Sequence, residues 1–171
     1  MSKVYIDTNI IDSRSSKNFS FEVWNKIISM IDSDHSTVLT SHLTLIELQQ
    51  NKDVITSQIG IDKYNKLLSI PIGSMWVKPP SRFGIAKFGT SGFGDAVGEQ
   101  DLYYKFLISK GFTKEDAQHI LSAIKDNCEY FLTFDKATIL NRIKSNLNQK
   151  QRDFLKIRFI DPVEFLDIEL T

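Results

Sequence analysis

Two aspartates stand directly after short apolar runs that have the composition of buried β-strands. Asp7 follows the run 4–6, and Asp135 follows the run 130–134. Both runs consist of residues that favour strands. The carboxyl ends of parallel strands lie at one edge of a sheet, which is where open α/β proteins bind their ligands. We therefore expect the two carboxylates to lie near each other in a candidate site.

Two further acids are expected near the same edge, each close to the start of a helix. Glu47 lies in the first turn or two of a helix that leaves the strand predicted over 37–41. Asp116 lies in the first turn of the helix that precedes the strand 130–134. That helix must run back across the sheet if this strand is parallel to the others. The sequence thus predicts four converging carboxylates: Asp7, Glu47, Asp116 and Asp135.

Each of these acids also has an ordinary structural explanation. Asp7 and Asp135 are suited to cap the helices that they precede, because a carboxylate accepts hydrogen bonds from free backbone amides. Residues 44–47 and 113–116 both fit a capping box, the second imperfectly because Asp is shorter than Glu. Four carboxylates at one edge would nevertheless raise one another's pKa. A protein tolerates such crowding mainly when a cation neutralises it.

The chemistry of the cluster depends on the cation that it would hold. Oxygen ligands without thiolates select a hard cation, Mg²⁺ or Mn²⁺. Cys128 is the single cysteine, so a Cys-based zinc site and an intrachain disulfide are excluded. One ion lowers the pKa of a bound water, and a pair about 3.5–4 Å apart can hold both the attacking and the leaving oxygen. The predicted reaction is phosphodiester hydrolysis.

The elements that would position these acids alternate along the chain. The predicted strands are 4–6, 37–41, 130–134 and 157–160. The main predicted helices are 21–32, one from residue 43, 53–69, 101–109, one that includes 117–124, one that includes 139–147 and one from residue 162. Alternation of this kind predicts an α/β fold, a three-layer α/β/α sandwich with a central, mainly parallel sheet.

Length and composition are those of an ordinary globular protein. The chain has 171 residues, with 21 basic and 21 acidic side chains, so no net field drives it onto nucleic acid or membrane. It begins with a predicted strand, and no apolar run approaches the roughly 20 residues of a membrane helix. We expect a single domain over 1–171, cytoplasmic, without a signal peptide or a membrane partner.

A glycine-rich insertion around 74–111 interrupts the alternation. Five glycines lie between 81 and 98, among phenylalanines, and Arg82 and Lys87 lie between the same limits. A loop of this length inside a compact domain is usually functional or disordered. Two interpretations stay open: a mobile linker, or a flap that binds single-stranded nucleic acid through aromatic stacking and phosphate contacts. Arg82 and Lys87 are the candidate phosphate contacts of the flap.

Four short motifs, taken in order, resemble those of the PIN-domain nucleases. They are Tyr5-Ile6-Asp7-Thr8-Asn9, Thr44-Leu45-Ile46-Glu47-Leu48, Asp116-Ala117-Gln118-His119-Ile120 and Leu132-Thr133-Phe134-Asp135. The resemblance covers most of the chain and implies a PIN-like fold in which the four acids bind Mg²⁺ or Mn²⁺ and cut RNA. It also implies that Asn9 and Thr133 support the carboxylates.

Many small stand-alone members of that family are toxins of toxin–antitoxin pairs. The resemblance therefore implies a metal-dependent endoribonuclease with an RNA substrate, and it makes an antitoxin protein and a second copy of the chain candidate partners. This chain departs from a minimal toxin in the long segment from Ser74 to Gly111. The departure bears on the toxin assignment and not on the nuclease assignment.

Histidines and a basic run complete the candidate residues. His35, His42 and His119 have no metal-ligand spacing. His119 lies within one helical turn of Asp116, and we interpret it as a packed or partly exposed histidine that could approach the site. Seven basic residues and a single acid lie between 136 and 158. This run is either a solvated face or an RNA-backbone patch beside Asp135.

Two rival functions remain. One is a phosphatase that uses Asp7 as its nucleophile, on the haloacid-dehalogenase plan. That plan requires an acid two residues after the nucleophile, and Asn9 stands there instead. The other is a catalytically silent RNA-binding or scaffold module. Silent relatives would be expected to lose acids, whereas all four positions are filled here.

Overall fold

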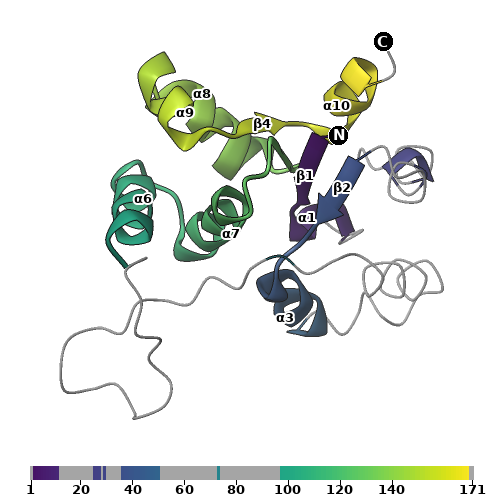
Figure 1. The fold of residues 1–171 in the computed structure, drawn as a ribbon, viewed down its shortest axis with the longest axis horizontal. Coiled ribbons are helices and arrows are strands. Elements are labelled where there is room, and N and C mark those ends of the chain that lie inside the picture. Colours follow the sequence, from purple (N-terminus) through teal and green to yellow (C-terminus); the bar gives the residue numbers. More distant parts are fainter. Residues whose placement is uncertain are drawn as a thin grey trace.

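The computed structural model describes residues 2–11, 25–27, 29, 36–50, 73 and 97–169, and within them the chain forms a four-stranded sheet flanked by helices (Figure 1). The strands are β1 (Ser2–Ile6), β2 (Ser36–Leu39), β3 (Tyr130–Leu132) and β4 (Arg158–Ile160). Their order is β2-β1-β3-β4, and every pair is parallel. The predicted α/β fold with a parallel central sheet is confirmed.

The register of β1 and β3 places their carboxyl ends level with each other. Ile6 is paired with Leu132, and the next amide along the first strand, Asp7 N, donates to Leu132 O at 3.1 Å. Thr133 N in turn donates to Ile160 O at 3.2 Å. The third strand therefore ends at Leu132, earlier than predicted, because Thr133 and Phe134 already belong to the turn that carries Asp135.

The helices follow the strands in the predicted alternation. They are α1 (Thr8–Ile11), α3 (His42–Gln50), α6 (Val97–Ser109), α7 (Lys114–Lys125), α8 (Asn141–Asn146), α9 (Gln149–Leu155) and α10 (Pro162–Glu169), with a π-helical turn η1 (Lys136–Leu140) leading into α8. Helix α9 was not predicted from the sequence. It begins at a capping box formed by Asn148 and Gln151. None of the described helices combines the length and apolar character needed to cross a membrane.

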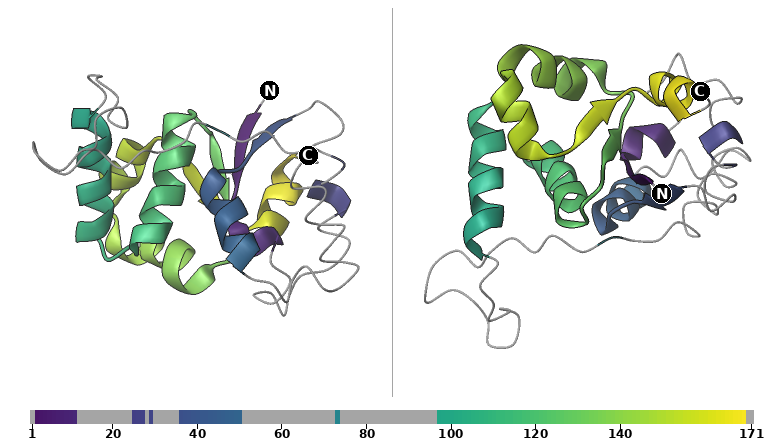
Figure 2. Two further views of the ribbon diagram at one scale, coloured as in Figure 1. Left: turned by 90° about the horizontal axis from the view of Figure 1, so that it is seen from below. Right: turned by 45° about the horizontal axis from the view of Figure 1, so that its top comes forward.

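Helices cover both faces of the sheet (Figures 1 and 2). Two clusters of buried hydrophobic side chains lie between the sheet and these helices, one on each face. One cluster joins Tyr5 and Phe131 of the sheet to buried side chains of α6, α7, η1, α8 and α9. The other joins Val4, Ile6 and Leu132 to side chains of α1, α3 and α10. Strand residues alternate between the two clusters, as a pleated strand requires. The three layers of the predicted sandwich are thus present.

Only the end of the predicted insertion lies among the described residues. Helix α6 begins at Val97, four residues before the predicted start at Asp101. It ends at Ser109, as predicted, and Gly111, the predicted C-terminal cap, has a φ of 88° that suits glycine, while Phe112 N donates to Leu107 O at 3.2 Å. The rest of the insertion, including Arg82 and Lys87, lies outside the described residues. So do the predicted helix 53–69, His35 and most of the predicted helix 21–32, of which residues 25–27 and 29 are helical.

Candidate functional site

Asp7 stands at the carboxyl end of β1 with its side chain buried and surrounded by hydrogen-bond donors. The residue is 6% exposed. Its Oδ1 accepts from Thr8 N at 2.8 Å, and its Oδ2 accepts from Asn9 Nδ2 and from Thr133 Oγ1, both at 2.7 Å. Burial raises the pKa of Asp7, and the negative charge of Glu47 adds to the rise, while the nearby His119 and the hydrogen bonds from Thr133 and Thr8 offset it in part.

Asn9 and Thr133 join Asp7 to the turn that carries Asp135. Asn9 Oδ1 accepts from Phe134 N at 2.9 Å, and Asn9 Nδ2 also donates to Thr133 Oγ1 at 2.7 Å. Thr133 Oγ1 accepts as well from Asp135 N at 3.0 Å. The two polar residues therefore occupy the position between the two strand-end carboxylates that a supporting role requires.

Glu47 lies beside Asp7, but it is not part of the predicted capping box. Helix α3 begins at His42, two residues before Thr44, so Thr44 is not its N-cap; the Thr44 hydroxyl is instead hydrogen-bonded to the Thr40 hydroxyl at 2.9 Å. The Glu47 carboxylate accepts from Thr8 Oγ1 on one oxygen and from His119 Nε2, at 3.0 Å, on the other. Tertiary contacts, and not the helix start, therefore fix this side chain.

His119 is the residue of the site whose contacts the sequence left open. It is 3% exposed, with Nε2 on Glu47 and Nδ1 within 2.7 Å of the Tyr5 hydroxyl. Burial alone would lower the pKa of His119, but the hydrogen bond to Glu47 and the charges of Asp7, Glu47 and Asp116 raise it. For Glu47 the directions are reversed. Burial alone would raise the pKa of Glu47, but the hydrogen bonds from His119 and Thr8 and the charge of His119 lower it overall.

Asp116 and Asp135 both act as helix caps, as their sequence positions allow. Thr113 Oγ1 accepts from Asp116 N at 3.1 Å, and Asp116 Oδ2 accepts from Thr113 N at 3.4 Å, which completes the capping box that begins α7. Asp135 Oδ1 accepts from Thr138 N at 2.7 Å, and its other oxygen accepts from the Thr138 hydroxyl. These two cap predictions are confirmed.

The four acids form two neighbouring pairs. The charge of Glu47 raises the pKa of Asp7, and His119 lies between Glu47 and Tyr5 of the sheet. Asp116 is near enough to Asp135 that, after burial, the Asp135 charge raises its pKa, while Arg142 and the Thr113 hydrogen bonds lower it. Across the described parts of the chain, no three His, Cys, Asp or Glu side chains are grouped closely enough to hold a metal ion.

The donor set nevertheless fits a hard divalent cation. The side-chain atoms offered by the four acids are all carboxylate oxygens, which Mg²⁺ and Mn²⁺ prefer. Neighbouring negative charge helps to raise the pKa of Asp7 and of Asp116, and a bound cation would remove that repulsion. The four carboxylates are thus ligands of the right chemical kind for such an ion, although they stand as two pairs and not as one group.

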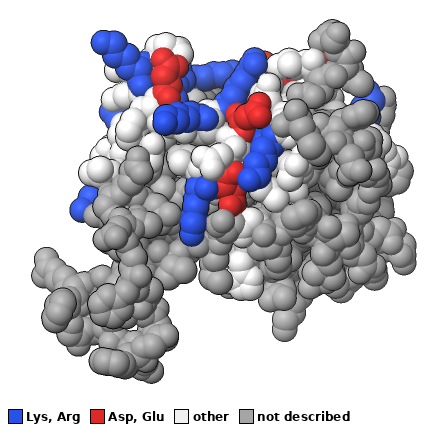
Figure 3. Space-filling model, viewed as in Figure 1, with Lys and Arg blue, Asp and Glu red and all other residues white. Residues whose placement is uncertain are grey.

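The basic run 136–158 does not form one continuous patch beside Asp135. Lys136 Nζ lies 3.3 Å from Asp161 Oδ2, and Arg142 donates to Gly111 O. Arg152 donates to the carbonyl of Leu147 at 3.1 Å and so binds the end of α8. On the face seen in Figure 3, Lys and Arg side chains alternate with acids. The run is divided by the turns between η1, α8, α9 and β4.

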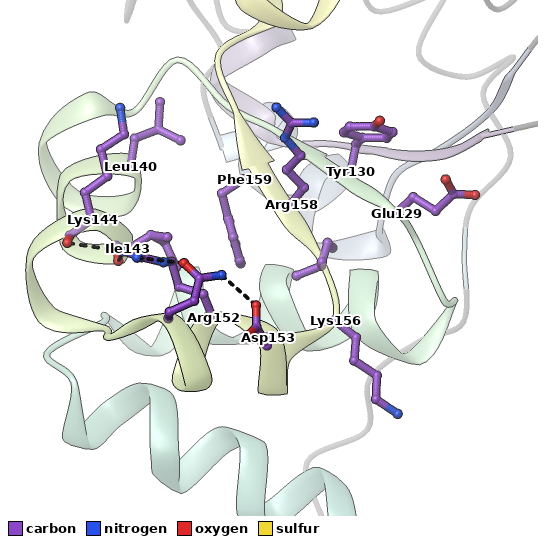
Figure 4. Close-up of a pocket in the computed structure, with 12 residues that line it drawn as sticks. Glu129, Tyr130, Leu140, Ile143, Lys144, Arg152, Asp153, Lys156, Arg158 and Phe159 are labelled. Atoms are coloured by element: carbon purple, nitrogen blue, oxygen red, sulfur yellow. Dashed lines mark hydrogen bonds between the residues drawn. The ribbon is translucent and has the colours of Figure 1, made fainter. Parts of the chain in front are cut away.

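The later part of the run lines a cavity of about 820 Å³ between β4, α8 and α9 (Figure 4). Its charged residues are Glu129, Lys144, Arg152, Asp153, Lys156 and Arg158. None of the four candidate acids, all of them described, lines this cavity. Its cations therefore do not share this cavity with the candidate acids, and within the run the charge of Arg142 lowers the pKa of Asp116.

Comparison with known proteins identifies a similar fold but no matching family. No protein-family model matches the chain, and no curated protein sequence matches it. The chain is similar in fold to a chain in the crystal structure of VapBC2 from Rickettsia felis bound to a DNA fragment from their promoter. The TM-score is 0.53 at 17% sequence identity, over 93% of this chain and 98% of that chain. At this identity the likeness concerns the fold alone.

Proposed function

We propose that the protein is a metal-dependent endoribonuclease that hydrolyses RNA phosphodiester bonds. The observation that carries the proposal is the buried Asp7 carboxylate at the end of a central parallel strand, held by three donors and next to Glu47. A protein that only needed a helix cap at this position would not need to enclose the charge so completely. The order of the four acidic motifs and the fold likeness to VapBC2 support the same function.

In this proposal Asp7, Glu47, Asp116 and Asp135 hold Mg²⁺ or Mn²⁺. The ion, when bound, would lower the pKa of a water molecule and stabilise negative charge on the phosphate. Asn9 and Thr133 keep the Asp7 oxygens in fixed directions, and Thr8 and His119 do the same for Glu47. Fixed carboxylates reduce the reorganisation needed when the ion and the phosphate arrive.

We further propose that the protein is the toxin of a toxin–antitoxin pair, with an antitoxin protein as its partner and a homo-oligomer as its assembly state. The family resemblance supports this proposal, as does the fold likeness to VapBC2, whose structure contains promoter DNA. Induced expression should arrest growth, and Asp7→Asn should relieve the arrest. Growth arrest that persists in the variant would count against RNA cleavage as its cause.

The central experiment is cleavage of labelled single-stranded RNA by the purified protein. Internal cleavage is expected in millimolar Mn²⁺ and none in EDTA, with Asp7→Asn as the inactive control. Undiminished cleavage in EDTA would overturn the metal mechanism. Release of phosphate from small phosphomonoesters, with RNA left intact, would instead favour the phosphatase.

A silent RNA-binding or scaffold module is the second candidate, and a specific observation favours it. Asp116 and Asp135 both cap helices, and both oxygens of Asp135 are already paired with Thr138. Residues retained for capping would persist without catalysis. The same RNA assay decides: binding of RNA without cleavage, with or without Mn²⁺, identifies the silent module.

A further inference from the structure

We propose that His119 is a positioning residue for Glu47, acting through a buried hydrogen-bonded chain that runs from Tyr5 through His119 to the Glu47 carboxylate. The inference rests on the proposed function, because it treats Glu47 as a metal ligand. It adds to that function a residue that touches neither metal nor substrate. Its role is to hold one oxygen of Glu47 while Thr8 holds the other.

The direction of the hydrogen bonds follows from the chemistry of the partners. A carboxylate can only accept, so the proton that joins His119 to Glu47 sits on Nε2 in both the neutral and the charged ring. In the neutral ring Nδ1 carries no proton and accepts from the Tyr5 hydroxyl, 2.7 Å away. Tyr5 therefore stabilises the tautomer that presents its N–H to Glu47.

The base of this chain is rigid. Tyr5 is fully buried in β1, and its ring stacks on Phe131 of β3 with 5.1 Å between centroids and 15° between planes. The Tyr5 and His119 rings meet edge to face at 6.1 Å. Since both strands belong to the centre of the sheet, the hydroxyl that holds His119 has little freedom to move.

The same contact sets the spacing of two helices that carry predicted acids. His119 lies on α7, one turn after Asp116, and Glu47 lies on α3. The bond of 3.0 Å between them spans 72 residues of sequence. Loss of the imidazole would free the Glu47 oxygen and would also remove a polar link between these helices, so both effects are expected to weaken metal binding.

Residues that hold metal ligands in place commonly contribute about 10–100-fold to metal affinity or activity. We therefore expect His119→Leu to raise the Mn²⁺ dissociation constant by about that factor. His119→Gln should recover most of the loss, because the glutamine amide nitrogen can reach the place of Nε2 and donate to Glu47. Tyr5→Phe, which removes only the hydroxyl, should give a smaller loss.

The test measures Mn²⁺ binding to the full chain by isothermal titration calorimetry, with circular dichroism to verify folding and RNA cleavage as a second readout. His42→Leu is the matched control, because His42 is an exposed histidine at the start of the helix that carries Glu47. The expected order of affinity is parent and His42→Leu first, His119→Gln and Tyr5→Phe next, and His119→Leu last.

The outcomes separate this inference from the proposed function. A parent protein that binds no Mn²⁺ overturns both. A parent that binds Mn²⁺ while His119→Leu binds it equally well overturns the positioning role alone. Equal losses in His119→Leu and His119→Gln, with both folded, would show that the ring packs and does not position. If His119→Leu fails to fold, the other two variants decide. Unchanged Mn²⁺ affinity in both Tyr5→Phe and His119→Gln rejects the proposal. A lower Mn²⁺ affinity in Tyr5→Phe supports it.

Discussion

The Thr133 hydroxyl donates a hydrogen bond to Asp7 Oδ2 at 2.7 Å, across 126 positions of sequence. The contact exists because β1 and β3 are parallel and in register, with Ile6 opposite Leu132, so that the residues just beyond them meet. The Thr133 hydroxyl oxygen also accepts hydrogen bonds from Asn9 Nδ2 and from Asp135 N. One buried hydroxyl thus joins the first candidate ligand to the turn that carries the fourth.

Replacing that hydroxyl should therefore reduce stability and activity together. Thr133→Val keeps the shape of the side chain but removes one donor to Asp7 and an acceptor for two N–H groups. We expect the free energy of unfolding to fall by about 1–3 kcal/mol, the usual effect of leaving buried polar groups unpaired. Urea denaturation in EDTA measures this change, with Thr133→Ser, which keeps the hydroxyl, as the control. Equal stability of the valine variant and the parent would show that the bond contributes nothing.

The two roles of Asp116 can be separated by changing its capping partner. Thr113→Ala removes the cap of α7 and should lower stability by about 1 kcal/mol, yet it should leave RNA cleavage intact. Asp116→Asn keeps an oxygen for the Thr113 amide but removes the charge, so cleavage should fall at least about tenfold with little change in stability. Comparable cleavage losses in the two variants would identify Asp116 as a cap only.

His119 predicts how the stability of the metal-free protein changes with pH. Its pKa is raised above the ordinary 6.5, since the hydrogen bond to Glu47 and the charges of Asp7, Glu47 and Asp116 outweigh burial. The folded state therefore binds this proton more tightly than the unfolded chain. The resulting stability is fully present below pH 6.5 and is lost as the pH rises through the folded-state pKa. Thermal melts in EDTA from pH 6 upwards should show the decline, and His119→Gln should flatten it.

The parts of the site that could be predicted from sequence are those fixed by local pattern or by sheet direction. Asp7 directly follows β1, and Asp135 lies in the turn after β3; both could be placed at one edge of the sheet because all pairings are parallel. The caps formed by Asp116 and Asp135 were predictable because the partners, Thr113 and Thr138, lie three residues away. Neither inference needed knowledge of side-chain packing.

The parts that could not be predicted depend on contacts between distant residues. The Tyr5–His119 bond spans 114 positions, and no local pattern marks it. Thr44 was mistaken for a helix cap because α3 already begins at His42, and the Thr44 hydroxyl is instead hydrogen-bonded to Thr40, which lies next to Ile6 O of the neighbouring strand. The basic run 136–158 is contiguous in sequence but divided in space, because a cap such as Arg152 is recognisable only once α8 and α9 are folded.

The substitution Asp7→Asn tests whether the fold is organised around a metal ligand. In EDTA two effects on stability oppose each other. Removal of the buried charge stabilises the folded state. The new amide nitrogen destabilises it, because this donor must face other donors, either Thr8 N or the side chains of Asn9 and Thr133. Stability without metal should therefore stay near that of the parent. With metal the parent gains stability by mass action, about 2.7 kcal/mol when free Mn²⁺ is a hundred times its dissociation constant, and the variant should lose most of that gain.

The measurement for Asp7→Asn is the melting temperature with EDTA and with millimolar Mn²⁺, beside the RNA cleavage assay. Asp153→Asn is the matched control, because Asp153 is exposed on α9, where it accepts a hydrogen bond from Gln149; it should keep the metal-induced shift and the activity. The variant at Asp7 should show little shift and no cleavage, since a neutral amide is a weaker ligand for a hard cation. An equal shift in parent and variant, with cleavage retained, would mean that Asp7 is a buried cap and that the metal binds elsewhere.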